Sequence, residues 1–256
     1  MIFDTHAHYD DEAFNEDREK LLNSVFSADA YRIVNIGASM DGSRESIAFA
    51  GKYPYIYAAV GLHPDYAADW NDNAKAELSA LSKNKKCVAI GEIGLDYYYE
   101  DPGRDLQKSA FEGQLALARE LKLPVVIHSR DAAKDTLDLI KASGIAEEGG
   151  IMHCFSYPPE VAAECLKLGF YIGVGGALTF KNARKLPDVV SMCPMDRLVI
   201  ETDCPYMAPV PFRGKRNDST YLTYVISRIA EIKGISAEEV ERITYENAIR
   251  VYRISE

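Results

Sequence analysis

Short apolar runs alternate with amphipathic helical segments along the whole chain, and this alternation constrains the fold more than any other sequence feature. A strand buried on both faces is a near-continuous apolar run, whereas a surface helix repeats apolar residues every three to four positions. The pattern therefore predicts strands and helices in strict alternation. The predicted strands cover residues 2–8, 31–37, 56–61, 87–92, 124–128, 150–153, 170–174 and 197–203.

Single helices between successive strands predict parallel pairing, because a parallel crossover needs a connection of that length. About eight such units in roughly 250 residues are the pattern of a (β/α)8 TIM barrel. A doubly wound open sheet is the structural alternative. No linker or repeat marks a boundary, so residues 1–256 are expected to form a single α/β domain. The predicted helices cover residues 12–28, 44–52, 74–83, 104–121, 131–142, 158–168, 181–190, 220–233 and 237–252.

The composition excludes some classes of protein. No apolar run is long enough to span a bilayer, and the N-terminus lacks a basic segment followed by an apolar signal core. The five cysteines include no Cys-X-X-Cys pair, so we expect reduced thiols and a cytoplasmic protein without a membrane partner. A formal net charge of −10 argues against a broad nucleic-acid footprint, although it leaves room for one cationic cleft.

Polar residues stand where most of the predicted strands end. His6 and His8 are two positions apart on one strand, so their side chains point the same way. In a barrel the carboxyl ends of the strands converge on one mouth, where active sites are built. Surface histidines would have no reason to choose such positions, whereas here every histidine of the chain does. The residues concerned are His6, His8, His63, Glu92, His128, His153 and Asp203.

The residue types indicate a hard or borderline divalent metal. Four imidazoles and two carboxylates, without a thiolate, suit zinc, manganese, iron or cobalt better than a soft metal. One open catalytic site commonly uses three protein ligands, so six donors predict two ions that share a carboxylate. Two ions about 3.5–4 Å apart would stabilise the entering and leaving oxygens of a hydrolysis. The predicted ligands are His6, His8, Glu92, His128, His153 and Asp203.

Several motifs together resemble the TatD family of metal-dependent deoxyribonucleases, which lies within the amidohydrolase-like TIM barrels. The motifs are Asp4-Thr5-His6-Ala7-His8, Gly91-Glu92-Ile93-Gly94-Leu95-Asp96, His128-Ser129-Arg130, His153-Cys154-Phe155-Ser156, Glu201-Thr202-Asp203-Cys204-Pro205 and Arg213-Gly214-Lys215-Arg216-Asn217. The sequence departs from the family at Tyr157, where a glycine is usual, and at Asp218-Ser219, where a proline is common.

The resemblance implies a metallo-dependent hydrolase fold and two divalent ions, which could be zinc, manganese or magnesium. His6, His8, Glu92 and Asp203 would hold one ion, while Glu92, His128 and His153 would hold the second, so that Glu92 bridges. The implied reaction is hydrolysis of phosphodiester bonds in DNA, as a 3′-exonuclease in some members. The expected partner is therefore single-stranded DNA or a 3′ end, with a monomer favoured.

The two carboxylates are also the predicted catalytic residues. An acidic residue at the end of an apolar strand is costly unless it is paired or ligating, so Glu92 is either a ligand or half of a salt bridge. Asp203 is predicted to ligate and to move the proton of the attacking water. Glu201 alternates with Asp203 along the strand and is predicted to orient a histidine or a water.

Other residues are candidates for contact with substrate. Arg213, Lys215 and Arg216 form the densest basic run after Asp203 and could bind phosphate, or could belong to a solvated loop. Arg130 is a second phosphate candidate. His63 could contact phosphate or a metal-bound water, or could be a structural histidine. Tyr97, Tyr98 and Tyr99 could stack on bases, with packing favoured for at least one of the three.

Two other functions remain open. The same site could hydrolyse a small amide, lactone or phosphoester, because one fold hosts many chemistries. The acidic net charge favours this alternative mildly, whereas the basic loop favours DNA. A non-enzymatic protein that binds metal or nucleic acid is disfavoured by the six donors.

Overall fold

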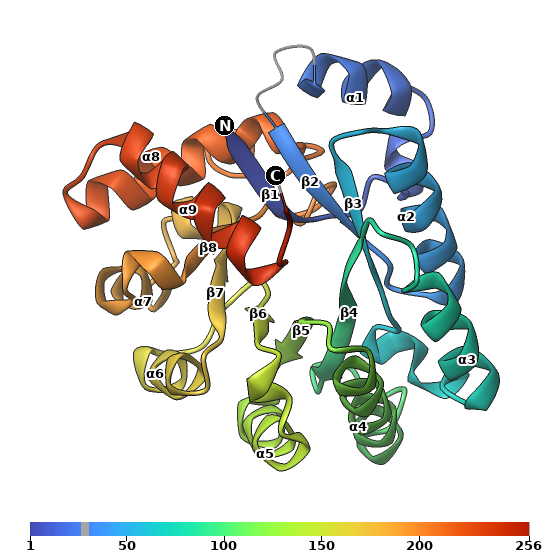
Figure 1. The fold of residues 1–256 in the computed structure, drawn as a ribbon. Helices are drawn as coiled ribbons and strands as arrows, with labels where there is room; N and C mark the ends of the chain where they lie inside the picture. Colours follow the sequence, from blue (N-terminus) through green and yellow to red (C-terminus); the bar gives the residue numbers. More distant parts are fainter. Residues whose placement is uncertain (27–30, 256) are drawn as a thin grey trace.

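The computed structural model describes residues 1–26 and 31–255, and its eight strands form one parallel sheet in the order β1 to β8 (Figure 1). The sheet curls back on itself, because Ala7 bridges Cys204 in parallel and the His8 N–H donates to the Cys204 carbonyl over 2.9 Å. This arrangement confirms the predicted TIM barrel. The strands are Ile2–Ala7, Tyr31–Ile36, Ile56–Val60, Cys87–Asp96, Val125–Arg130, Gly150–Met152, Tyr171–Val174 and Leu198–Ile200.

Helices surround the barrel, and the last of them crosses its amino end, where both chain termini lie (Figure 1). None of the helices within residues 1–26 and 31–255 has the length and apolar character that a bilayer crossing demands. The helices are α1 (Arg18–Phe26), α2 (Met40–Lys52), α3 (Asp72–Leu81), α4 (Arg104–Leu121), α5 (Ala133–Ser143), α6 (Pro159–Lys167), α7 (Leu186–Met192), α8 (Leu222–Lys233) and α9 (Ala237–Val251).

Four predicted boundaries were wrong. The helix predicted over 12–28 is a 3-10 turn, Glu12–Phe14, followed by α1, and residues 27 and 28 lie outside the described residues. The helix predicted from 181 begins only at Leu186. Strand β4 continues to Asp96, so Glu92 lies within the strand and not at its end. Strand β8 ends at Ile200, three residues before Asp203.

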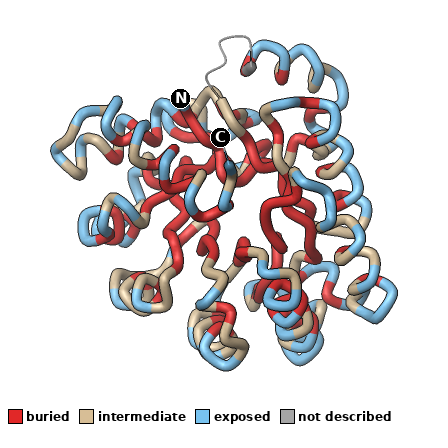
Figure 2. Tube along the Cα trace, viewed as in Figure 1, coloured by how far each residue is buried: buried red, intermediate tan, exposed pale blue. Residues whose placement is uncertain are grey.

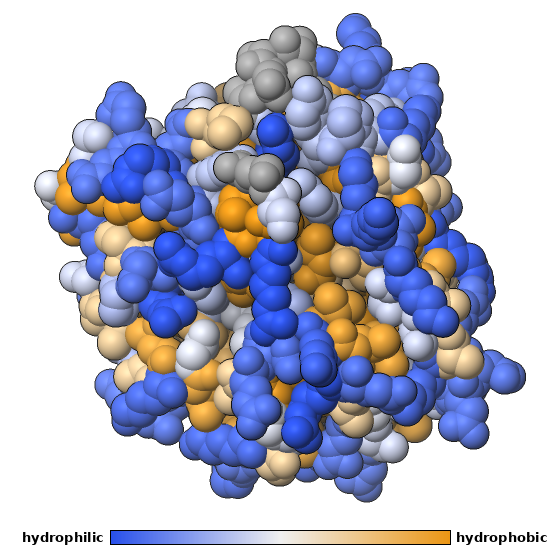
Figure 3. All heavy atoms as spheres, in the orientation of Figure 1, coloured by the Kyte–Doolittle hydropathy of each residue, from blue (hydrophilic) through white to orange (hydrophobic). Residues whose placement is uncertain are grey.

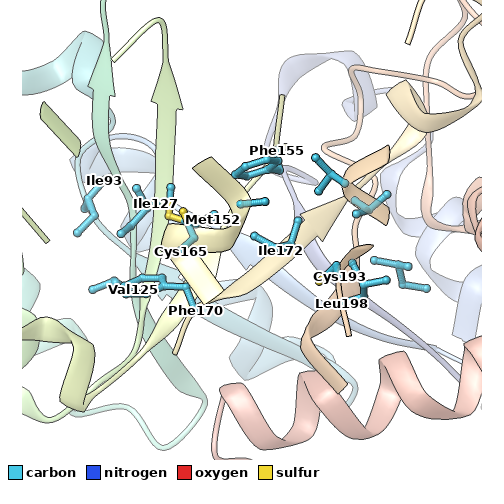
Figure 4. Packing of buried hydrophobic residues seen from close by; sticks show 14 of the residues in the cluster. Ile93, Val125, Ile127, Met152, Phe155, Cys165, Phe170, Ile172, Cys193 and Leu198 are labelled. Atoms are coloured by element: carbon cyan, nitrogen blue, oxygen red, sulfur yellow. The ribbon is translucent and has the colours of Figure 1, made fainter. Parts of the chain in front are cut away.

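The core has an inner and an outer part. Residues inside the barrel pack against α9, as where Phe3 of β1 contacts Tyr245 and Tyr252. Outward-facing residues pack under the surrounding helices, as the cluster with Ile127, Met152 and Cys165 shows (Figure 4). Buried backbone is therefore concentrated in the strands (Figure 2), and the face seen in Figure 3 is mainly hydrophilic with scattered apolar residues.

The pairing of two strands is irregular beside predicted donors. The register shifts between Asp4 and Ala7 of β1, next to His6, and between Ile90 and Ile93 of β4, next to Glu92. Such irregularities re-aim side chains and are frequent beside active sites. The outer half of β4 then pairs with β5, which places Gly94 opposite His128 and brings the two strands' polar residues to the same mouth.

Candidate metal centre

All six predicted donors meet at the carboxyl end of the barrel. The Nε2 atoms of His6 and His8 lie 3.0 Å apart, so both imidazoles of β1 face one point. The His153 ring stacks on the His6 ring, with a centroid distance of 3.5 Å. His6 is completely buried, which removes it from competing water. The structure therefore gathers side chains from β1, β4, β5 and the segments after β6 and β8.

The Glu92 carboxylate lies at the centre of the cluster. Its Oε2 is 3.4 Å from His6 Nε2 and 3.9 Å from His8 Nε2. Its Oε1 is 2.9 Å from His128 Nδ1 and 3.7 Å from His153 Nε2. The two oxygens thus face two different pairs of imidazoles.

Asp203 lies on the other side of the same imidazoles. Its Oδ1 is 3.5 Å from His8 Nε2 and 3.7 Å from the Nε2 atoms of both His6 and His153. The backbone holds this carboxylate in place, because the Asp203 N–H donates to the His6 carbonyl over 2.9 Å. Asp203 adopts a φ of 57°, which is rare for a non-glycine residue and is typical of functional sites.

Three of the four imidazoles have a second contact behind them. His8 Nδ1 lies 3.0 Å from the Ile36 carbonyl, and His128 Nε2 lies 3.0 Å from Asp96 Oδ2. His153 Nδ1 lies 3.2 Å from Glu201 Oε1, which also accepts the Cys154 backbone N–H. Such contacts fix the ring orientation and raise the basicity of the nitrogen that faces the cluster. The predicted orienting role of Glu201 agrees with this geometry.

The electrostatics of the cluster favour bound cations. Burial alone would lower the pKa of His128, but hydrogen bonds to Asp96 and Glu92 outweigh burial and raise it to about 10. Burial is likewise outweighed by nearby carboxylates at His8 and His153, whose pKa values rise to about 9. Burial and the neighbouring His153 lower the pKa of His6 to about 4. A buried group of carboxylates that draws protons onto imidazoles fits divalent metal ions, which supply the same positive charge.

A pocket of about 840 Å³ opens over the cluster. His63 and Arg130, two of the predicted substrate residues, line it. The His63 Nδ1 accepts the Asp65 backbone N–H over 3.2 Å, which leaves its Nε2 as the protonated nitrogen. The Arg130 guanidinium lies 3.7 Å above the ring centre of Tyr98. Pocket walls also include Tyr99, whereas the Tyr97 hydroxyl donates to Asp135 and its ring packs on the core.

The predicted basic run divides into two parts. Arg213 and Lys215 are exposed on the loop after β8, outside the pocket walls. Arg216 instead forms two hydrogen bonds of 2.7 Å with the Asp17 carboxylate and lies over the ring of Phe14. The structure therefore does not bring Arg216 to the pocket.

Sequence reasoning missed two buried acids. Asp96 was overlooked because β4 was expected to end at Glu92, although residues two apart on a strand share a face and Asp96 follows Glu92 by four. Asp4 accepts hydrogen bonds from the Thr202 N–H, the Thr202 hydroxyl and the Ser219 hydroxyl, over 2.6 to 2.9 Å. Asp4 thereby ties β1 to the segment that carries Asp203. Its place two residues before His6, within an apolar run, was the available signal.

Comparisons with known proteins agree with this site. A family model described as "TatD related DNase" matches residues 3–253. The chain belongs to this family. It is 46% identical over 255 residues to the "Uncharacterized metal-dependent hydrolase YabD" of Bacillus subtilis, with 100% of each chain covered. It is 32% identical over 257 residues to the "3'-5' ssDNA/RNA exonuclease TatD" of Cronobacter sakazakii, covering 98% of this chain and 97% of that one.

Solved structures of the family have the same fold. The crystal structure of YjjV, a TatD homologue from Escherichia coli K12, superposes with a TM-score of 0.92 at 30% identity, covering 99% of this chain and 98% of that one. The TatD-family chain described here is therefore a metal-dependent hydrolase, and the His, Asp and Glu cluster is its candidate metal centre.

Proposed function

We propose that the protein is a nuclease that removes nucleotides from the 3′ end of single-stranded DNA with two divalent metal ions. Zinc, manganese and magnesium are the candidate ions. His6, His8, Glu92 and Asp203 would hold one ion, and Glu92, His128 and His153 the other. The position of Glu92 carries the proposal, since each of its oxygens faces a different pair of imidazoles, at 3.4 and 3.9 Å and at 2.9 and 3.7 Å. A carboxylate so placed is suited to bridge two ions.

The chemistry divides between the ions and the side chains. Two ions at these positions would acidify a water molecule and neutralise charge on the phosphate. Asp203 accepts the proton of the attacking water and passes it to the leaving oxygen. Burial would raise the pKa of Asp203, but the neighbouring histidines outweigh burial and lower it, so the carboxylate is ionised and ready to accept a proton at neutral pH.

Two residues of the pocket wall are placed to bind phosphate. The His63 Nε2–H is free to donate, because its Nδ1 already accepts the Asp65 N–H. The Arg130 side chain borders the same pocket and provides several donors with a permanent positive charge. Both lie on the side of the pocket away from Asp203, so the scissile phosphate is held between them and the carboxylates.

The test uses a 5′-labelled single-stranded oligonucleotide. Protein stripped with chelator should be inactive, and activity should return with zinc, manganese or magnesium as a ladder that shortens from the 3′ end. A matched oligonucleotide with a blocked 3′ end should remain intact. Undiminished cleavage by the metal-free protein would contradict the metal mechanism. Turnover of small phosphoesters, amides or lactones without cleavage of any oligonucleotide would instead favour the small-molecule alternative.

Asp203→Asn tests the assigned base. Loss of general-base catalysis typically costs 100-fold or more, so kcat should fall by at least about that factor. Asp196→Asn is the matched control, because Asp196 is exposed beside the amino end of β8 and should leave kcat unchanged. A kcat of the Asp203→Asn variant within a few-fold of the original would remove Asp203 from this role.

A further inference from the structure

Two loops at the carboxyl end of the barrel carry only positive charge. The first, residues 176–187, follows β7, and the second, residues 204–217, follows β8. Neither contains an aspartate or a glutamate, although acidic residues outnumber basic ones by 39 to 29 in the whole chain. The basic residues of the two loops are Lys181, Arg184, Lys185, Arg213, Lys215 and Arg216.

The two loops contact each other and form one surface, which we call the cationic platform. The Val210 N–H donates to the Thr179 hydroxyl over 2.8 Å. The Arg213 guanidinium lies 4.5 Å above the ring centre of Phe180. A Cβ at Gly176 would lie 1.9 Å from the Met207 carbonyl, so the backbones pack directly. Charges that are distant in sequence are therefore neighbours here.

The charges of the platform are available to a ligand. Five of the six side chains are exposed, and none of these five makes an ion pair with a carboxylate within residues 1–26 and 31–255. Arg216 is the exception, because Asp17 neutralises it. The five are Lys181, Arg184, Lys185, Arg213 and Lys215. A concentration of unpaired cations in an acidic protein attracts a polyanion to one place.

The platform continues directly from the pocket. Tyr206 and Met207 begin the second loop, and both line the pocket beside Asp203. Tyr206 is 56% exposed, and its hydroxyl donates to Asp11 over 2.7 Å, so the ring is a fixed flat surface at the pocket edge. Aromatic rings beside a basic track are the usual means of holding single strands without sequence preference.

We infer that the strand leaving the pocket lies along the cationic platform, with Arg213, Lys215 and the Lys181–Lys185 segment bound to phosphates that are not cleaved. This inference rests on the proposed function and extends it: the preferred substrate is a strand of several nucleotides and not a dinucleotide. The platform contributes to binding of the strand, whereas the metal centre alone handles the last phosphodiester.

The test compares two double variants, Arg213→Gln/Lys215→Gln and Lys83→Gln/Lys85→Gln. Lys83 and Lys85 are exposed just before β4, at the opposite end of the barrel, so this control removes the same charge elsewhere. Binding of a fluorescent 20-nucleotide DNA strand is measured by anisotropy in chelator, so that cleavage plays no part. The platform variant should bind about five-fold more weakly, and its log K against log salt should be shallower by about 0.7 per lost contact. The control should match the original protein.

The kinetic arm uses the metal-loaded enzyme. The platform variant should raise KM for the 20-nucleotide strand, while its kcat and its turnover of a dinucleotide stay unchanged. Equal DNA affinity in the two double variants, or an equal loss of dinucleotide and 20-nucleotide turnover, would overturn the platform. Failure of the proposed function is a separate result, because it appears as an original enzyme that cleaves no oligonucleotide of either length.

Discussion

At the residue scale, the orientation of each imidazole depends on what its outer nitrogen contacts. Asp96 is 3% exposed and serves two groups, since its Oδ2 lies 3.0 Å from His128 Nε2 and its Oδ1 accepts the Tyr98 N–H over 2.9 Å. The Gln107 side chain fixes the Asp96 backbone from the other side. His128 is consequently held between two carboxylates, Asp96 behind and Glu92 in front.

Asp96→Asn keeps the size of the side chain and removes its charge and one acceptor. We expect the affinity for the ion next to His128 to fall about 10- to 100-fold, because that is the usual cost of losing such an outer partner. Isothermal titration with manganese gives the affinity of each ion. Glu100→Gln, an exposed acid four residues on, is the control and should titrate as the original protein does. Two unchanged affinities in Asp96→Asn would show that Asp96 does not orient His128.

Tyr157 is a departure from the family, and its hydroxyl has a clear place. It lies 2.9 Å from the Ser129 hydroxyl and accepts the Ala132 N–H over 3.0 Å, so it holds the turn that carries Arg130. Tyr157→Phe should lower the free energy of unfolding by about 1 kcal/mol, the typical value of one hydrogen bond, and should raise KM with little change in kcat. Denaturant unfolding and steady-state kinetics measure the two effects. A loss of stability without any change in KM would limit Tyr157 to packing.

At the element scale, the approach of β4 to β5 depends on one glycine. Gly94 has a φ of 147°, and a Cβ there would lie 1.9 Å from the His128 carbonyl oxygen. Any side chain would force apart the two strands that carry Glu92 and His128.

Gly94→Ala should therefore destabilise the protein by about 2–4 kcal/mol, the range for strain combined with overpacking. Gly51→Ala is the matched control, because Gly51 lies in α2 with nothing within 4 Å of its Cβ position. That change should be neutral or stabilise by up to about 1 kcal/mol, through helix propensity. The midpoint of urea unfolding gives both values, and equal midpoints for the two variants would contradict the steric argument.

The same elements show what the sequence could predict. Helix α4 matches its predicted bounds, 104–121, because a long amphipathic repeat is a strong signal. The segment 12–28 was not predictable in this way, since the Arg18 side chain binds three backbone carbonyls and separates α1 from the turn before it. The start of α7 could have been found, because Pro187 stands in its first turn. The extension of β4 to Asp96 depends on pairing with β5, which no local pattern reveals.

At the scale of the whole molecule, the metal centre joins parts of the chain that are almost 200 residues apart. His6 and Asp203 lie on the first and last parts of the barrel wall, and bound ions would connect them with Glu92 between. Ions that bind the folded chain alone stabilise it by mass action, about 2.7 kcal/mol at a hundredfold excess over the Kd. Metal loading should therefore raise Tm, and chelator should lower it.

This stabilisation should depend on pH, with a sign set by the imidazoles. Without metal, the pKa values of His8, His128 and His153 are raised to about 9, 10 and 9, so they bind protons in the folded protein. That contribution to stability is complete below the ordinary value of about 6.5 and is lost as pH rises towards 9–10. Ligation needs neutral imidazoles, so metal binding releases these protons and strengthens as pH rises.

The difference in Tm between loaded and chelator-treated protein should thus widen from pH 6.5 to 9. Calorimetry in two buffers of different ionisation enthalpy should detect the released protons directly. A second titration with His63→Gln serves as control, because His63 has its Nδ1 occupied by the Asp65 N–H and belongs to neither predicted ligand set. Its proton release should equal that of the original protein. A Tm difference that stays constant or narrows with rising pH would mean that the imidazoles of the cluster are not the groups that give up their protons to the metal.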